Sequence, residues 1–264
     1  MGILTFVGML FSIGAIVTGI LLSGASMLSF WDPVSAMIVV APTIGCLVVS
    51  FPIGVLAKIP AHMGVLIRKE VTPEEQIEKI VELANKVRSG GILALEEEQL
   101  PEATMQYGVR MIVDGIHEDE IKNALEESLV SIGERHSEAI GVYEKFAAFA
   151  PGFGMCGTVI GLINMLLNMD MSDPNAVNSL GANMSVALIT TLYGSFLANV
   201  IFLPLTARLK LVHKREMFYK SLICTGLLAI QRGSNPTFIY ELLCEQLNQE
   251  RKKKVANPKG KAGE

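Results

Sequence analysis

The sequence predicts an all-α, polytopic membrane protein with four transmembrane helices, the third and fourth of which extend into a helical cytoplasmic domain. Half of the 264 residues are hydrophobic, and the mean hydropathy of +0.43 is higher than that of a typical soluble chain. The apolar residues gather in runs of about 20 residues, the length that a helix needs to cross a bilayer. These runs carry no Asp, Glu, Lys, Arg or His, and they are 3–22, 34–57, 149–169 and 184–207.

The basic residues indicate an orientation, because Lys and Arg collect in the cytoplasmic loops of membrane proteins. All 22 Lys and Arg lie at 58–145 or from position 208 onward, whereas the short connections at 23–33 and 170–183 carry none. We therefore expect these connections outside and both termini in the cytoplasm. The predicted division is an N-terminal transmembrane hairpin at 1–57, a cytoplasmic helical domain at 58–148, a second transmembrane hairpin at 149–207, and a cytoplasmic helical tail at 208–264 with a basic, disordered end.

The first two apolar runs have the features of an ordinary hairpin. Ala15 and Gly19 stand at the spacing at which small residues let a neighbouring helix approach closely. The second run contains Pro42 and Pro52, and the sequence Pro52-Ile53-Gly54 predicts a kink near its inner end.

The polar segment that follows contains two predicted helices. Thr72-Pro73-Glu74-Glu75 places a threonine cap, a proline and a glutamate where a helix N-terminus favours them. Gly90-Gly91 predicts the end of that helix, and a second helix is expected at 103–113.

Two further helices are predicted to be continuous with the last two spans. Ile121, Leu125 and Leu129 recur on one helical face, and no strong helix breaker follows before the third apolar run. Residues 208–230 similarly extend the fourth run, and Asn235-Pro236 predicts the start of one more helix.

The sequence gives no sign of an enzyme. It has no phosphate loop, no Ser-His-Asp arrangement and no residues at metal-ligand spacing. Gly152-Phe153-Gly154 is not a nucleotide loop, because no βαβ pattern surrounds it. We expect no cofactor, no metal and no nucleic acid, and membrane lipid as the surrounding medium.

The third and fourth apolar runs carry the candidate functional residues. Pro151 is followed by glycines at three- and four-residue spacing, and Thr190-Thr191, Gly194 and Pro204 lie in the fourth run. Proline and glycine are common in ordinary membrane helices. The same residues also fit a water-lined or moving pair of helices.

The string A-L-I-T-T-L-Y-G-S-F-L-A-N-V-I-F-L-P, which ends at Pro204, resembles the signature of the MotA/PomA family. This family, in the MotA/TolQ/ExbB superfamily, is the A subunit of the flagellar motor stator. Ala150-Pro151-Gly152-Phe153-Gly154, the four spans and the long segment between the second and third spans also match it. The resemblance implies a stator subunit that forms, with a B subunit, an ion channel converting ion-motive force into torque on the rotor.

Two other functions remain open. The ExbB/TolQ proteins, proton-motive energisers of outer-membrane transport, are similar in the last two spans but have a single preceding span. The other alternative is a membrane scaffold without ion coupling.

The resemblance also assigns roles to residues. Pro151 and Pro204 match the prolines that couple ion flow to rotation. Thr158, Thr190 and Thr191 match the residues that line the ion path.

The resemblance further implies partners. It predicts a homo-oligomeric ring, a pentamer, around a dimer of the B subunit (MotB/PomB), which supplies the carboxylate that the spans of this chain lack. It favours H⁺ as the transported ion, with Na⁺ the alternative because hydroxyl oxygens of Thr158 and Thr191 suit a hard cation. Arg88 and Glu96 match the charged pair that contacts the rotor switch protein FliG, although Glu97 and Glu98 follow Glu96 and could shift this alignment by a residue.

Overall fold

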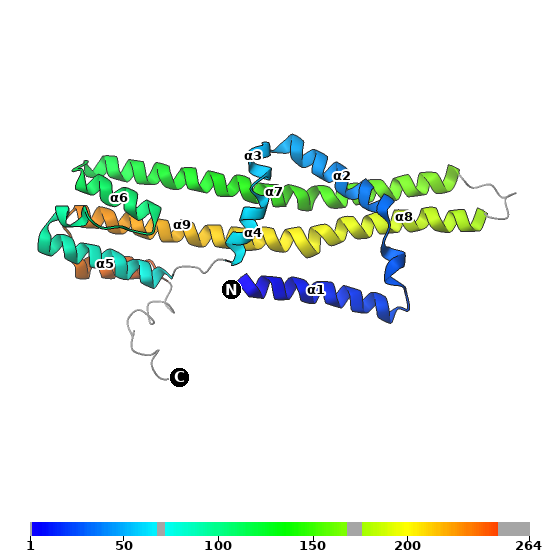
Figure 1. Ribbon diagram of the computed structural model, residues 1–264, viewed down its shortest axis with the longest axis horizontal. Coiled ribbons are helices and arrows are strands. Elements are labelled where there is room, and N and C mark those ends of the chain that lie inside the picture. Colours follow the sequence, from blue (N-terminus) through cyan, green and yellow to red (C-terminus); the bar gives the residue numbers. More distant parts are fainter. Residues whose placement is uncertain (1, 68–71, 168–175, 248–264) are drawn as a thin grey trace. The chain divides into compact units, whose positions relative to one another are not determined.

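The computed structural model describes residues 2–67, 72–167 and 176–247 (Figure 1). Within these ranges every regular element is a helix, which confirms the all-α prediction. The chain divides into two compact units, one formed by Met1–Arg68 and His136–Val212 and the other by Lys69–Arg135 and His213–Glu264.

The first unit contains the membrane helices. Four helical segments of the described residues are long and apolar enough to cross a membrane, so the four-span prediction is confirmed. The elements of this unit are α1 (Gly2–Leu22), the 3-10 turn η1 (Met27–Phe30), α2 (Pro33–Ser50), α3 (Ile53–Leu56), α4 (Ile59–Ile67), the later part of α7 (Glu118–Leu167), α8 (Ala176–Phe196), the π-helical turn η3 (Leu197–Phe202) and the first part of α9 (Leu203–Gln231).

The second span is shorter than predicted. α2 begins at Pro33, directly after its N-cap Asp32, whose side chain accepts a hydrogen bond from the amide of Ser35, and it ends at Ser50. Phe51 is extended (φ −135°, ψ 144°), because the residue before a proline is disfavoured in the helical region. The kink expected at Pro52 is therefore wrong, since the helix stops there and α3 starts afresh.

The third and fourth spans continue into longer helices, as predicted. α7 runs without a break from Glu118 to Leu167 and contains Pro151. The end predicted for this span, at 168–169, lies outside the described residues. α8 begins at Ala176, ahead of the predicted start at 184, and π-helical η3 separates it from α9.

The second unit is a helical bundle with its own apolar core. Its elements are α5 (Pro73–Gly90), the 3-10 turn η2 (Ile92–Leu95), α6 (Ala103–Val113), the beginning of α7, the later part of α9 and α10 (Pro236–Glu245). Its largest fully buried side chains are Ile77, Ile80, Leu83, Leu95, Met105, Ile112, Ile121, Leu125, Leu222, Ile223 and Leu227.

The helix ends of this unit follow the sequence signals. Thr72 and Glu75 form both halves of a capping box, and Gly91 takes the left-handed φ of 79° that favours glycine. α6 has the predicted bounds. Asn235 caps α10 by accepting a hydrogen bond from the amide of Thr237. The basic end of the tail lies outside the described residues.

Candidate functional site

Glycines on α7 allow its backbone to lie directly against α8. A Cβ atom built on Gly157 would lie 2.5 Å from the Cβ of Thr190, and one on Gly161 would lie 2.7 Å from the Cβ of Ala187. A Cβ on Gly154 would lie 3.0 Å from the carbonyl oxygen of Thr190. Side chains larger than hydrogen therefore do not fit on this face of α7, which is how small residues bring membrane helices together.

Two threonines meet at this contact and form a cluster of four oxygens. The hydroxyl of Thr158 lies 3.1 Å from the carbonyl of Ala187 and 3.2 Å from that of Gly154. The hydroxyl of Thr191 lies 3.4 Å from each of the same two carbonyls, and the two hydroxyls contact each other. These four oxygens have more lone pairs than the hydroxyls of Thr158, Thr190 and Thr191 and the helix N–H groups can fill, so unused lone pairs remain. Thr191 is exposed, so the cluster opens to the helix surface.

Thr190 plays a different part in the geometry from its neighbour. Its side chain is fully buried, and its hydroxyl donates to the carbonyl of Ala187 at 2.9 Å. Its side chain fills the space above Gly157. The three threonines singled out in the sequence therefore lie together, but only the hydroxyls of Thr158 and Thr191 are accessible from the helix surface.

The two candidate prolines lie in neighbouring helical segments. Pro151 is within α7, and its Cα would lie 3.1 Å from a Cβ built on Gly194. Pro204 directly follows the π-helical turn and Leu203. The rings of Phe146 and Phe202 stack with centroids 3.7 Å apart, which places the stretch before Pro151 beside the stretch before Pro204.

Tyr193 was not singled out in the sequence, yet it connects α8 to the segment between α1 and α2. Its hydroxyl donates to the carbonyl of Phe30 at 2.5 Å and accepts from the amide of Asp32 at 3.1 Å. The hydroxyl of Ser35 lies 3.4 Å from the carbonyl of Val186. A phenol inside an apolar helix is the signal that could have indicated such a partner, since buried tyrosine hydroxyls are usually hydrogen-bonded.

The candidate rotor-contact residues lie in the second unit. Arg88 is exposed in the last turn of α5, and Glu96 is exposed directly after η2. Among the described residues neither side chain takes part in an ion pair. Glu98 differs, because it binds Lys86 and lies 3.9 Å from Lys79, both on α5. The hydrogen bonds that Lys86 donates to the carboxylates of Glu98 and Glu82 raise the pKa of its ammonium group.

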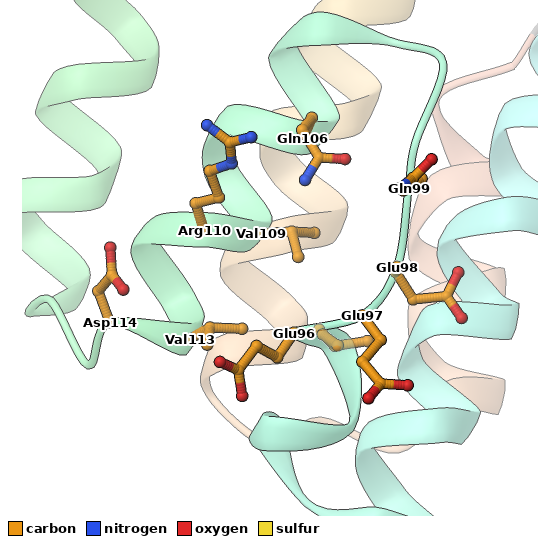
Figure 2. A pocket seen from close by; sticks show the side chains of 10 residues that line it. Glu96, Glu97, Glu98, Gln99, Gln106, Val109, Arg110, Val113 and Asp114 are labelled. Carbon is orange, nitrogen blue, oxygen red and sulfur yellow. The ribbon is translucent and has the colours of Figure 1, made fainter.

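A cavity of about 430 Å³ lies beside this segment. Figure 2 shows Glu96 and Glu98 pointing in different directions, with Glu98 turned toward α5. The cavity carries charges of both signs at a solvent-facing edge. Its lining residues are Leu95, Glu96, Glu97, Glu98, Gln99, Gln106, Val109, Arg110, Val113 and Asp114.

Comparison with known proteins gives a consistent result. Residues 96–221 match the MotA/TolQ/ExbB proton channel family. The chain is 38% identical to chemotaxis protein PomA of Vibrio alginolyticus over 94% of this chain and 96% of PomA. It is 35% identical to motility protein A of Treponema phagedenis over 97% of each chain.

The fold agrees with the same relationship. The solved structure of the flagellar MotAB stator complex from Bacillus subtilis superposes with a TM-score of 0.85 at 30% identity, covering 95% of this chain and 98% of that chain. This four-span helical chain therefore belongs to the MotA/TolQ/ExbB proton channel family. Within that family it is one of the motility A proteins, the group of MotA and PomA, which confirms the resemblance seen in the sequence.

Proposed function

We propose that this chain is a stator subunit of the bacterial flagellar motor and forms, with a B subunit, an ion channel that drives the rotor. The observation that carries this proposal is the oxygen cluster of Thr158 and Thr191. It lies between two spans whose described residues contain no Asp, Glu, Lys, Arg or His. Ion pathways through membranes depend on ionisable or strongly polar groups at depth. The chain supplies hydroxyl and carbonyl oxygens, and the partner supplies the carboxylate.

The oxygen cluster suits a cation that has lost part of its water. Carbonyl and hydroxyl oxygens replace hydration oxygens in ion-selective sites, and the close glycine contact keeps Thr158 and Thr191 in place. Each charge that crosses the membrane yields about 2.3 kcal/mol per 100 mV. This free energy drives the movement of the ring relative to the B subunit.

The assembly is a homo-oligomeric ring, a pentamer, around a B-subunit dimer in the bacterial plasma membrane. Two lining helices from one chain cannot enclose a pore, so several copies are needed. α7 and α8 also carry exposed apolar side chains that suit lipid or a neighbouring copy. They include Met155, Val159, Ile163, Leu166 and Leu188. The distribution of Lys and Arg supports cytoplasmic termini.

Rotor contact belongs to Arg88 and Glu96, with FliG as the partner. Both side chains are exposed and free of internal ion pairs among the described residues, as a long-range electrostatic contact requires. Glu98 is bound to α5 and is the weaker candidate.

The coupling ion is H⁺ or Na⁺, and H⁺ is favoured. The oxygen cluster alone is compatible with Na⁺, since hard cations prefer oxygen ligands. Swimming speed measured against external Na⁺ at fixed pH distinguishes the two, because an H⁺ motor does not respond to Na⁺.

Ion flux through the reconstituted complex tests the proposal. The complex of this chain with its B subunit is placed in liposomes, a membrane potential is imposed, and ion entry is recorded. Replacing Thr158 and Thr191 together by valine should abolish flux, whereas Thr190→Val should leave most of it, because the side chain of Thr190 is fully buried and its hydroxyl has no open access to an ion. Absence of flux through the unaltered complex would refute the channel function. Failure of the chain to restore motility to cells without their own A subunit would favour the ExbB/TolQ-like energiser or the scaffold.

A further inference from the structure

The π-helical turn and the proline after it leave the backbone carbonyl of Asn199 in the fourth span without a helical donor. The amide of Leu203 donates to the carbonyl of Ala198, five residues back, and not to Asn199. In this five-residue pattern the donor for the carbonyl of Asn199 would be residue 204. That residue is Pro204, which has no N–H. The combination of the π turn and the proline therefore frees the carbonyl of Asn199.

The side chain of Asn199 adds a second free oxygen at the same place. Its amide nitrogen donates to the carbonyl of Ser195 at 2.9 Å and to the hydroxyl of Ser195 at 3.2 Å. A carbonyl can only accept, so the atom facing Ser195 must be the nitrogen of the carboxamide. The oxygen Oδ1 therefore faces away, and among the described residues it accepts no hydrogen bond.

These oxygens lie on the same helical row as the threonine cluster. Thr191, Ser195 and Asn199 are four residues apart, and all three are exposed. Residues at this spacing lie on one face, separated by roughly 6 Å along the helix axis. The polar row thus leads from the Thr158 and Thr191 oxygens toward Pro204.

Other exposed hydroxyls of the spans are chemically different. Ser12 and Thr18 on α1 each donate their single proton to the carbonyl four residues back, at 3.0 and 2.7 Å. Serine and threonine hydroxyls in apolar helices commonly donate to the carbonyl four residues back in this way. Asn199 has two acceptor oxygens left over, and a membrane interior without water or a partner makes each of them costly.

We infer that Ser195 and Asn199 form a second polar site of the ion path, which binds the transported ion after it leaves the Thr158 and Thr191 cluster. The ligands from this chain are the backbone carbonyl and Oδ1 of Asn199 and the hydroxyl of Ser195. π turns inside helices occur frequently at functional sites, and here the turn produces the free carbonyl. This inference rests on the proposed channel function.

The test is ion flux through the complex with its B subunit in liposomes, normalised to the amount of complex incorporated. Asn199→Leu removes Oδ1 at similar volume and should lower flux about tenfold, equivalent to about 1.4 kcal/mol. It should also raise the ion concentration at half-maximal flux. Ser12→Ala is the matched control, because it removes an exposed hydroxyl that is already bonded, and its flux should equal that of the unaltered complex.

A second variant tests the backbone carbonyl without changing any polar side chain. Pro204→Ala provides an N–H that can bond the Asn199 carbonyl, so it should also lower flux. Because both changes act on one site, the flux of the double variant should be close to the lower of the two fluxes measured for the single variants. A flux equal to the product of the two separate losses would contradict a shared site.

The outcomes separate this inference from the function on which it rests. If the unaltered complex conducts and Asn199→Leu conducts equally well with the same ion dependence, the second site is wrong while the channel stands. If the unaltered complex conducts no ion, the proposed function itself fails.

Discussion

Gly194 lies against the backbone of Ala150 so closely that a Cβ at position 194 would be 2.5 Å from the Ala150 carbonyl oxygen. The obstacle is backbone, which cannot rotate aside as a flexible side chain can. The same position would lie 3.1 Å from the Cα of Pro151. The contact between α7 and α8 therefore depends on glycine at this point.

Gly194→Ala should separate α7 from α8 and disturb the geometry of the Thr158 and Thr191 oxygens. Overpacking of a tight contact costs about 1–3 kcal/mol, so we expect a lower Tm of the purified complex and loss of motility. Gly181→Ala in the same helix is the control, because a Cβ there meets nothing within 4 Å. Equal Tm values for the two variants would show that the close contact does not constrain the helices.

Arg88→Glu should weaken torque, since it reverses a solvent-facing charge at the proposed rotor contact. A compensating charge reversal on the rotor protein should restore part of it, as measured by the rotation of tethered cells. Glu96→Lys should behave in the same way. Normal torque in the Arg88→Glu and Glu96→Lys double variant would exclude these residues from the contact.

Glu98→Lys serves as the contrasting variant at the same segment. It places a cation next to Lys86 and Lys79, so its main effect should be a lower Tm. A rotor mutation should not compensate it. If a rotor charge reversal rescues Glu98→Lys but not Glu96→Lys, the contact residue is Glu98.

Lys220 forms a largely buried ion pair with Glu102 at 2.6 Å and also bonds Thr104 at 3.1 Å. Lys220→Met should destabilise the second unit by about 2 kcal/mol, because it leaves a mostly buried carboxylate with its capping bond to Met105 alone. Thermal unfolding in detergent measures this loss. Lys210→Met is the control, since its pair with Glu144 is exposed and should change stability by less than about 0.5 kcal/mol.

Cys224 should resist alkylation in the folded protein. Burial, together with the nearby Glu102 carboxylate, raises the pKa of its thiol to about 11. Because only the thiolate reacts, iodoacetamide at pH 8 should label it at least about a hundredfold more slowly than an ordinary exposed cysteine. An engineered Ser89→Cys variant provides that comparison, and mass spectrometry of digested protein locates the label. Rapid labelling of Cys224 without unfolding would contradict its burial in α9.

The sequence predicts helix ends well where a short motif stabilises the end through interactions between residues close together in the chain. Thr72 and Glu75 form the predicted capping box, and Gly91 ends α5, because these signals act within one turn. The break at Phe51 exceeds the predicted kink, since the proline also restricts the residue before it. The presence of Pro204 does not reveal the π turn, which depends on how the segment before it meets α7.

The site is predictable in composition but not in geometry. Thr190 and Thr191 are adjacent, yet a helix turns about 100° per residue, so one is buried against Gly157 and the other opens to the surface. Which of the two faces outward follows only from the position of α7. Tyr193 and its partners Phe30 and Asp32 are far apart in the sequence, so no local pattern could pair them.

Replacing Pro151 tests whether α7 needs a missing backbone hydrogen bond at this position in order to couple ion flow to movement. Proline has no N–H, so the carbonyl of Ala147, four residues back, lacks its usual donor, and such a gap costs about 3 kcal/mol in a soluble helix interior. Pro151→Ala restores this donor and should stiffen α7 at the level of Gly194. We expect normal amounts in the membrane, normal binding of the B subunit and sharply reduced torque. Pro204→Ala should have the same effect on torque.

Immunoblots of membrane fractions, co-purification of the B subunit and the rotation speed of tethered cells under load provide the three measurements. The coupling role requires that only the third measurement falls. If Pro151→Ala disappears from the membrane, the proline is needed for folding. If the variant rotates at full torque, a flexible α7 at this point is unnecessary, because the alanine helix would have gained a hydrogen bond without any loss of function.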